Sequence, residues 1–216
     1  CTAVAKPASQ TPLSALALAV LAERAGVPKG VLSVVTGSAS QIGGEMTANP
    51  IVRKLSFTGS TEIGRVLIKD CADTVKKVSM ELGGNAPFIV FDDADIDAAV
   101  DGAIVCKFRN AGQTCVCANR IYVQDGVYDE FSKKLAAKVA EMKIGNGVDD
   151  GVVIGPLIDM KAVEKVEEHL KDATGKGASI LTGGHRHSLG GSFYEPTVLD
   201  GVQGRNLWSA GSAVPV

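Results

Sequence analysis

The sequence lacks an excess of charge of either sign. Its 216 residues include 22 Lys and Arg against 24 Asp and Glu, which gives a formal net charge of −2 at pH 7. A chain this close to neutrality has no strong field with which to attract nucleic acid or an anionic membrane surface. We therefore expect neither nucleic acid nor a membrane as a partner.

Long apolar runs and export signals are also missing. The longest nearly uncharged stretch, residues 11–22, is too short to span a bilayer, and no secretory signal pattern is present. The five cysteines are an odd number without the spacing of a disulfide framework, which indicates a reducing compartment. These absences predict a cytoplasmic protein.

The chain has no initiator methionine and begins at Cys1, inside a predicted strand. Its last residues, 210–216, complete no recognisable element. We interpret the sequence as a piece of a longer protein, and a mature chain left by processing is the alternative.

What the sequence does contain is a regular alternation of short apolar runs with stretches of helical periodicity. Strands are predicted at residues 2–5, 31–36, 52–57, 77–82, 86–91, 120–124, 179–182 and 193–199. Helices are predicted at residues 11–25, 37–48, 59–72, 96–108, 127–142 and 160–176. This alternation is typical of an α/β fold with a parallel sheet covered on both faces. Thr11 is expected to cap the first helix. One apolar face of that helix is expected from Leu13, Leu16, Ala17, Val20 and Leu21.

Two segments could bind phosphate. Gly59 and Ser60 lie in a tight turn that precedes a predicted helix, and helix N-termini attract phosphate. The segment has neither G-x-G-x-x-G nor the lysine of a P-loop, so an ordinary capped helix remains an alternative. Lys6 follows the carboxyl end of the first strand, where ligands gather in open α/β sheets, although most lysines are merely solvated.

The most informative chemical feature is Cys115, on a polar turn, together with Glu81 at the end of an apolar strand before a Gly-Gly break. A thiol nucleophile and a carboxylate base are a workable pair for covalent chemistry on a carbonyl. A free thiol with a pKa of about 8.5 is mostly protonated at neutral pH, so such a site must lower this pKa or supply a base. An apolar setting between Met80 and Leu82 could raise the pKa of Glu81 toward neutrality.

Three separated motifs carry a specific resemblance. They are Phe57-Thr58-Gly59-Ser60, Glu81-Leu82-Gly83-Gly84 and Gly112-Gln113-Thr114-Cys115. In this order and spacing they resemble the aldehyde dehydrogenase superfamily, and the likeness extends from Cys1 to about residue 202. Within the superfamily the chain is most similar to succinate-semialdehyde dehydrogenases, on residues 6–12, 108–120 and 154–158.

The resemblance implies a domain organisation. Residues 1–81 would be the C-terminal part of a Rossmann-like NAD(P)-binding domain, and residues 82–203 an incomplete α/β catalytic domain. Residues 204–216 depart from the family pattern and would be an atypical tail. The full-length parent is expected to be a homo-oligomer.

The resemblance also implies a mechanism. Cys115 would attack the carbonyl of a small-molecule aldehyde, the adduct would pass a hydride to bound NAD(P)+, and Glu81 would deprotonate the water that hydrolyses the thioester. The implied substrate is succinic semialdehyde. The alternatives are another aldehyde, such as an aminoaldehyde, and a catalytically incomplete fragment that binds nucleotide.

The family pattern further assigns the cofactor contacts. Lys6 would bind the adenosine ribose, Gly59 and Ser60 the pyrophosphate, and the backbone of Leu82 would lie beside the nicotinamide. Many NAD-preferring members carry a Glu where this chain has Ser9. Because Ser9 removes the repulsion of a 2′-phosphate and Lys6 adds attraction, we expect NADP as the preferred cofactor, with NAD possible.

Two further residues have expected roles. Arg109, six residues before Cys115, would bind the distal carboxylate of the substrate, since a guanidinium can hold a carboxylate bidentately; a surface Arg at a helix end is the alternative. Cys117 is a candidate partner of Cys115 in a reversible disulfide that would switch off the nucleophile, or else a small buried apolar residue. No metal is expected, because His185 and His187 have no third ligand nearby.

Overall fold

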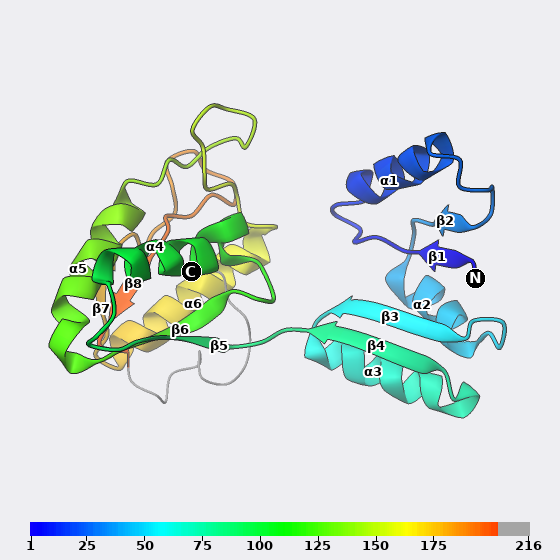
Figure 1. Cartoon of the computed structure of the whole chain (residues 1–216), viewed down its shortest axis with the longest axis horizontal. Coiled ribbons are helices and arrows are strands. Elements are labelled where there is room, and N and C mark those ends of the chain that lie inside the picture. The colour runs from blue at the N-terminus through cyan, green and yellow to red at the C-terminus, as the bar shows by residue number, and fades with distance from the viewer. Residues whose placement is uncertain (203–216) are drawn as a thin grey trace. The chain divides into compact units, whose positions relative to one another are not determined.

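The chain divides after Leu82, as the computed structural model of residues 1–202 shows (Figure 1). We call the part from Cys1 to Leu82 unit 1, and the part that begins at Gly83 unit 2. The atypical tail expected at residues 204–216 lies outside the described residues. No helix in the described part is long and apolar enough to cross a membrane.

Unit 1 is built from two parallel strand pairs and three α-helices. In chain order its elements are β1 (Ala3–Ala5), α1 (Leu13–Arg24), β2 (Leu32–Val34), α2 (Ala39–Ala48), β3 (Lys54–Gly59), α3 (Thr61–Cys71), the 3-10 turn η1 (Ala72–Thr74) and β4 (Lys77–Leu82). β1 pairs with β2, and β3 pairs with β4, both in parallel. Figure 1 shows α3 running along the β3–β4 pair.

The pairing of β3 with β4 places two of the sequence motifs at one edge. Their register runs from Lys54 opposite Lys77 to Gly59 opposite Leu82, so both strands end together. A Cβ on Gly64, in the first half of α3, would lie only 2.6 Å from a methyl carbon of Leu82. The absence of a side chain at Gly64 therefore lets α3 pack closely on the end of β4.

The first helix and the second strand differ from expectation. Thr11 does not cap α1: Pro12 occupies the N-cap position, and no side chain accepts a hydrogen bond from the first turn. The expected apolar face of α1 is not buried, since Leu13 is 76% and Leu21 55% exposed. β2, expected as a buried strand, contains no buried residue.

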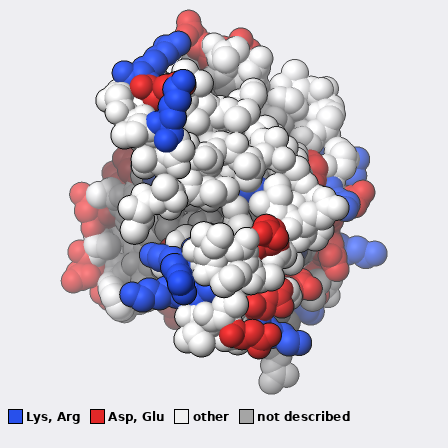
Figure 2. All heavy atoms as spheres, turned by 90° about the vertical axis from the view of Figure 1, so that its right-hand side faces the viewer, with Lys and Arg blue, Asp and Glu red and all other residues white. Residues whose placement is uncertain are grey.

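Figure 2 shows a face on which charged side chains form small, separated groups amid a largely uncharged surface.

Unit 2 has a larger core. Its elements are β5 (Ala86–Val90), α4 (Ile96–Phe108), the 3-10 turn η2 (Arg109–Gly112), β6 (Ala118–Val123), α5 (Asp125–Ala140), α6 (Met160–Gly175), β7 (Ser179–Thr182) and β8 (Val198–Asp200). β5 and β6 are parallel, whereas β7 and β8 are antiparallel. The strands of residues 1–202 pair two by two, so the expected α/β alternation is present as four short sheets.

Two apolar clusters hold unit 2 together. In the larger one, Val100 of α4 packs with Phe131 and Val139 of α5, and all three side chains are at most 1% exposed. The smaller one joins α6 to Leu157 and Tyr194. His169 of α6, expected to be solvated, is only 5% exposed, and burial lowers its pKa. Its position on the buried face of α6, three residues after Val166, explains the difference.

Candidate active site

Gly59 and Ser60 form the junction between β3 and α3. Ser60 has an extended backbone, and its Oγ accepts a hydrogen bond of 3.3 Å from the N–H of Ile63, which makes it the N-cap of α3. A Cβ on Gly59 would lie 2.5 Å from Cζ of Phe57, so a side chain here would displace the Phe57 ring. The N–H groups of Thr61 and Glu62 face outward from the first turn, where no helical carbonyl precedes them.

Lys6 and Ser9 follow the carboxyl end of β1 and lie within reach of each other. The Nζ atom of Lys6 donates a hydrogen bond of 3.4 Å to Oγ of Ser9. Lys6 is half-buried and Ser9 is exposed. The structure therefore brings these two candidate cofactor residues together, with an ammonium and a hydroxyl open to a ligand.

Glu81 and Leu82 are the last two residues of β4, opposite Thr58 and Gly59 of β3. Leu82 is half-buried, while Glu81 is exposed. The desolvated setting that the sequence suggested for Glu81 is thus not formed by Met80 and Leu82 within unit 1. What the strand pairing does establish is that Leu82 and Gly59 lie side by side.

The segment before Cys115 is a left-handed turn. α4 ends at Phe108, and η2 follows with φ/ψ of 55°/38° at Asn110 and 53°/36° at Ala111, and a φ of 73° at Gly112. Side chains other than glycine adopt this conformation rarely, at a cost of roughly 1–2 kcal/mol per residue. Such strain persists only where surrounding contacts enforce it.

Gln113 supplies those contacts. Its Nε2 donates to the carbonyl oxygen of Asn110 at 3.2 Å, and Nδ2 of Asn110 donates to the carbonyl oxygen of Gln113 at 3.2 Å. Its Oε1 accepts a bond of 2.8 Å from the N–H of Ile158. One side chain therefore closes the left-handed turn and fastens it to the loop at residue 158. The sequence analysis did not single out this role, although Gln113 lies within a recognised motif.

Cys115 and Cys117 have contrasting environments. Both thiols are free, but Cys115 is exposed, whereas Cys117 is 2% exposed. A hydrogen bond of 3.1 Å from the N–H of Cys117 to the carbonyl oxygen of Thr114 closes the turn between them. Cys115 is therefore presented to solvent on a turn that is anchored at both ends.

Arg109 is the exposed first residue of η2. Among residues 1–202, no carboxylate lies within 4 Å of its guanidinium. The hydroxyl of Thr114 lies 3.5 Å from the Arg109 carbonyl oxygen, across the turn from Cys115. A cation without an internal partner and an exposed thiol thus belong to the same short turn.

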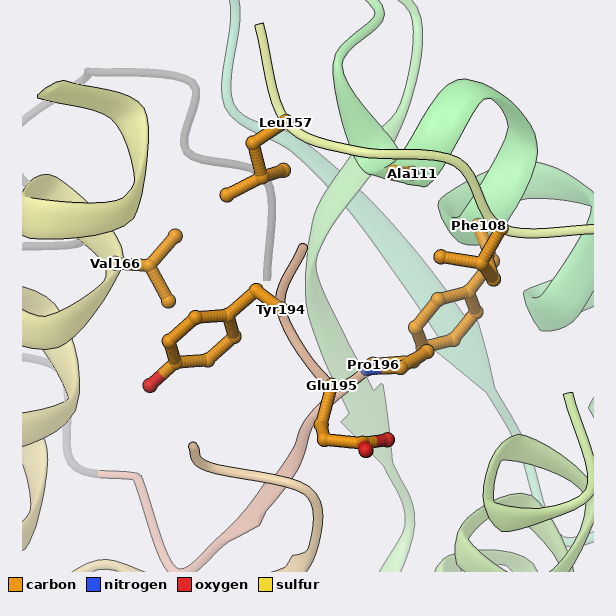
Figure 3. A pocket seen from close by; sticks show the side chains of 8 residues that line it. Phe108, Ala111, Leu157, Val166, Tyr194, Glu195 and Pro196 are labelled. Atoms are coloured by element: carbon orange, nitrogen blue, oxygen red, sulfur yellow. The ribbon is translucent and has the colours of Figure 1, made fainter. Parts of the chain in front are cut away.

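Behind this turn lies a small apolar cavity. Figure 3 shows Phe108, Leu157 and Tyr194 around it, with Ala111 at its edge. Its volume of about 20 Å³ is enough for one water molecule and too small for a substrate. Burial raises the pKa of Tyr194 to about 12, so its hydroxyl stays protonated at neutral pH. This cavity is a packing feature that supports the turn.

A buried lysine lies next to the turn, and the sequence analysis missed it. Lys107, in the last turn of α4, is 5% exposed, and its Nζ donates a bond of 3.1 Å to Oδ1 of Asn119. Burial lowers its pKa from 10.5 to about 8. Helical spacing could have revealed it, because Lys107 follows the buried Val100 and Ala103 by seven and four residues.

The histidine pair does not form a metal site. His187 lies 3.7 Å from Glu195, while Arg186 between the two histidines binds Glu167 through two hydrogen bonds of 2.7 and 2.8 Å. In the part of the chain that the structure describes, no group of three His, Cys, Asp or Glu could hold a metal ion.

Comparison with known proteins gives a consistent picture. The model of the aldehyde dehydrogenase family matches residues 1–208. The chain is 71% identical to a glutarate-semialdehyde dehydrogenase of Pseudomonas aeruginosa over 199 residues, and 69% identical to an NADP(+) succinate-semialdehyde dehydrogenase of Escherichia coli K12 over 199 residues. Each match covers 92% of this chain and 41% of the relative.

A solved structure agrees with the fold. The crystal structure of succinate-semialdehyde dehydrogenase from Burkholderia pseudomallei matches with a TM-score of 0.96 at 62% identity, over 99% of this chain and 44% of that one. The chain therefore spans less than half the length of the relatives it matches.

The buried Lys107 predicts a dependence of stability on alkaline pH. Its folded pKa of about 8 lies below the ordinary 10.5, so between these values the unfolded chain holds a proton that the folded chain has released. The contribution of this group to the free energy of unfolding therefore rises with pH across that window, by about 3 kcal/mol in all. Urea unfolding at about pH 7.5 and about pH 10 measures the rise, with Lys107→Met as the control. If Lys107→Met shows the same rise in the free energy of unfolding, the pH dependence comes from another group.

Proposed function

The chain belongs to the aldehyde dehydrogenase family, and from that premise we propose that its gene product oxidises succinic semialdehyde to succinate with NADP+. The family and the relatives support an oxidoreductase that acts on an aldehyde with NAD(P)+. The observation that supports the substrate is the turn that carries both the exposed Cys115 and the Arg109 guanidinium, which has no carboxylate partner among residues 1–202. The overall reaction converts the aldehyde, water and NADP+ into the carboxylic acid, NADPH and a proton.

Cys115 acts as the nucleophile in this proposal. Its thiolate attacks the aldehyde carbon and forms a thiohemiacetal on Sγ, which loses a hydride to become a thioester. Arg109 binds the distal carboxylate, so that the other end of the substrate meets the thiol. The guanidinium suits this task because its planar N–H groups match the two oxygens of a carboxylate.

The residues of unit 1 fit a dinucleotide. Gly59 leaves the backbone of the turn without a side chain, and the N-terminus of α3 presents N–H groups of its first turn to an anion, with Glu62 as the one acidic residue of that turn. NADP+, when bound, accepts the hydride. Gly59 and Ser60 hold the pyrophosphate, Lys6 binds the adenosine ribose, and the backbone of Leu82 lies beside the nicotinamide. We accordingly assign residues 1–81 to the cofactor domain and residues 82–203 to the catalytic domain.

Glu81 acts in the last chemical step of the proposal, the hydrolysis of the thioester. Its carboxylate removes a proton from the water that attacks the thioester, which releases the acid and restores the Cys115 thiol. The proposal rests on the place of Glu81 at the end of β4, directly before the Gly-Gly segment that leads into unit 2. The complete protein is proposed to work as a homo-oligomer.

Glutaric semialdehyde is a second candidate substrate. A relative that is 71% identical is named for it, and the two aldehydes differ by one methylene between the carbonyl and the carboxylate. A single methylene in a binding site changes binding by about 1–3 kcal/mol, so one enzyme can turn over both.

The role of Arg109 is tested by charge deletion. Arg109→Ala in the full gene product is expected to raise KM for succinic semialdehyde at least about tenfold, because a charge-assisted contact is lost. KM for butanal, which has no carboxylate, should change little. Arg109→Lys keeps the positive charge but lacks the planar guanidinium. Its KM for succinic semialdehyde should therefore lie between those of the wild type and Arg109→Ala. Equal effects of Arg109→Ala on both aldehydes would remove Arg109 from the substrate site.

The cofactor preference depends on Ser9 and Lys6. Wild type is expected to have a higher kcat/KM with NADP+ than with NAD+. Ser9→Glu should reverse this order, because the carboxylate repels a 2′-phosphate and accepts hydrogen bonds from a ribose diol. Ser9→Gln, of the same size without the charge, is the matched control and should keep the order of the wild type. A wild-type ratio below one contradicts the proposal.

A disulfide between Cys115 and Cys117 remains a proposal. The burial of Cys117 favours the packing role, since its thiol must turn outward before it can reach Cys115. Treatment with peroxide followed by intact-mass measurement is the test. Formation of the disulfide removes two hydrogens from the wild type and none from Cys117→Ser, and activity returns with a thiol reductant. If the mass of the wild type rises by added oxygen atoms and never falls by two hydrogens, the disulfide does not form and the switch does not exist.

A further inference from the structure

Lys107 is a buried cation that the proposed reaction does not use. Its side chain is 5% exposed, at the C-terminal end of α4, where the helix dipole favours a positive charge. Removing an ammonium from water is costly unless it is well hydrogen-bonded. A methionine or leucine would fill the same space without that cost, so the ammonium has a use beyond packing.

The ammonium determines how Asn119 is oriented. Nζ of Lys107 lies 3.1 Å from Oδ1 of Asn119, and Nδ2 of Asn119 lies 3.1 Å from the carbonyl oxygen of Gly84. An ammonium only donates hydrogen bonds, and a carbonyl only accepts them. If the amide were turned over, Nδ2 would face the Lys107 ammonium, which is also a donor, and Oδ1 would face the Gly84 carbonyl oxygen, which is also an acceptor. Lys107 thereby directs the amide N–H of Asn119 toward Gly84.

The Gly84 peptide borders the Cys115 turn. A Cβ on Gly84 would lie 3.6 Å from the carbonyl oxygen of Cys115, so the two backbones are in near contact. The next carbonyl, that of Asn85, accepts bonds of 3.2 and 2.7 Å from Nε and Nη2 of Arg120. Consecutive residues of β6, the strand that follows the Cys115 turn, therefore hold consecutive carbonyls of the segment that follows Glu81.

We propose that Lys107 is a positioning residue, which acts through the amide of Asn119 to hold the Gly84 peptide against the backbone of the Cys115 turn. Three hydrogen-bonding groups form this bridge: the Lys107 ammonium, the Asn119 amide and the Gly84 carbonyl. The bridge spans α4, β6 and the segment before β5, which are elements of unit 2. Its consequence for catalysis rests on the proposed role of Cys115 as the nucleophile.

The principal test cuts the bridge at each end. Lys107→Met removes the ammonium, Asn119→Ala removes the amide, and the double variant removes both. Each single variant is expected to lower kcat for succinic semialdehyde about tenfold, the effect of one lost hydrogen bond, with KM changed less than about twofold. Because both changes break the same bridge, the double variant should be no slower than the slower single variant. Multiplicative losses would show that the two residues act separately and would overturn the proposal.

A second variant separates positioning from folding. Asn119→Asp keeps an oxygen for Lys107 and pairs it with a charge, but it replaces the donor to Gly84 with an acceptor. Because the ion pair with Lys107 offsets part of the repulsion between the two acceptors, the thermal unfolding midpoint is expected to be no lower than that of Asn119→Ala, while kcat falls at least as far. An Asn119→Asp protein with the kcat of the wild type would overturn the proposal even if Lys107→Met fails to fold.

A readout without turnover distinguishes this inference from the proposed function. The rate at which iodoacetamide alkylates Cys115, read by peptide mass spectrometry at neutral pH, should change at least about threefold in Lys107→Met and Asn119→Asp. Lys76→Met, which removes a buried lysine of unit 1 bonded to the carbonyls of Asn49 and Val52, is the matched control and should leave the rate unchanged. An unchanged rate in the two bridge variants contradicts the positioning role. If the alkylation rate changes in the bridge variants but the wild type oxidises neither semialdehyde, the positioning role of Lys107 stands and the proposed substrates are wrong.

Discussion

The left-handed turn at Asn110–Gly112 is the constraint on which the candidate site depends. It follows the end of α4 directly and lies between Arg109 and Cys115 in the chain. Three consecutive residues with positive φ are unfavourable by themselves. The hydrogen bonds of Gln113 to Asn110 and to Ile158 offset this cost and tie the turn to a loop 45 residues further along the chain. The backbone between Arg109 and Cys115 is therefore held by hydrogen bonds from within the turn and from the loop at residue 158.

Much of the fold followed from the sequence because the elements obey local rules. β4 and α4 have the bounds that hydrophobic periodicity predicts, residues 77–82 and 96–108. In α4 the acidic Asp95 caps the helix, and Val100 and Ala103 are buried on one side of it together with Lys107. The family motifs also lie where they were expected, at the ends of β3 and β4 and after α4.

The errors arose where burial depends on partners distant in the sequence. Leu13 and Leu21 of α1 have the spacing of a buried face, yet both are mostly exposed. His169 has charged neighbours on α6 but faces the core, because periodicity, and not the nearest residues, decides which side is buried. The bridge from Lys107 through Asn119 to Gly84 joins residues up to 35 positions apart. No local pattern could have revealed such a contact.

The choice between succinic and glutaric semialdehyde returns to the same turn. If Arg109 binds the distal carboxylate as proposed, it would serve either aldehyde, because the charged group is identical and only the chain between the two ends differs. Discrimination therefore depends on how firmly the distance between the Cys115 thiol and the Arg109 guanidinium is held. A rigid turn favours one chain length by the cost of misplacing the carbonyl, whereas a turn that relaxes by about the length of one C–C bond accepts both. Under the proposed roles of Cys115 and Arg109, selectivity between the two aldehydes would thus depend on the contacts of Gln113 that hold the turn, and not on the identity of Arg109.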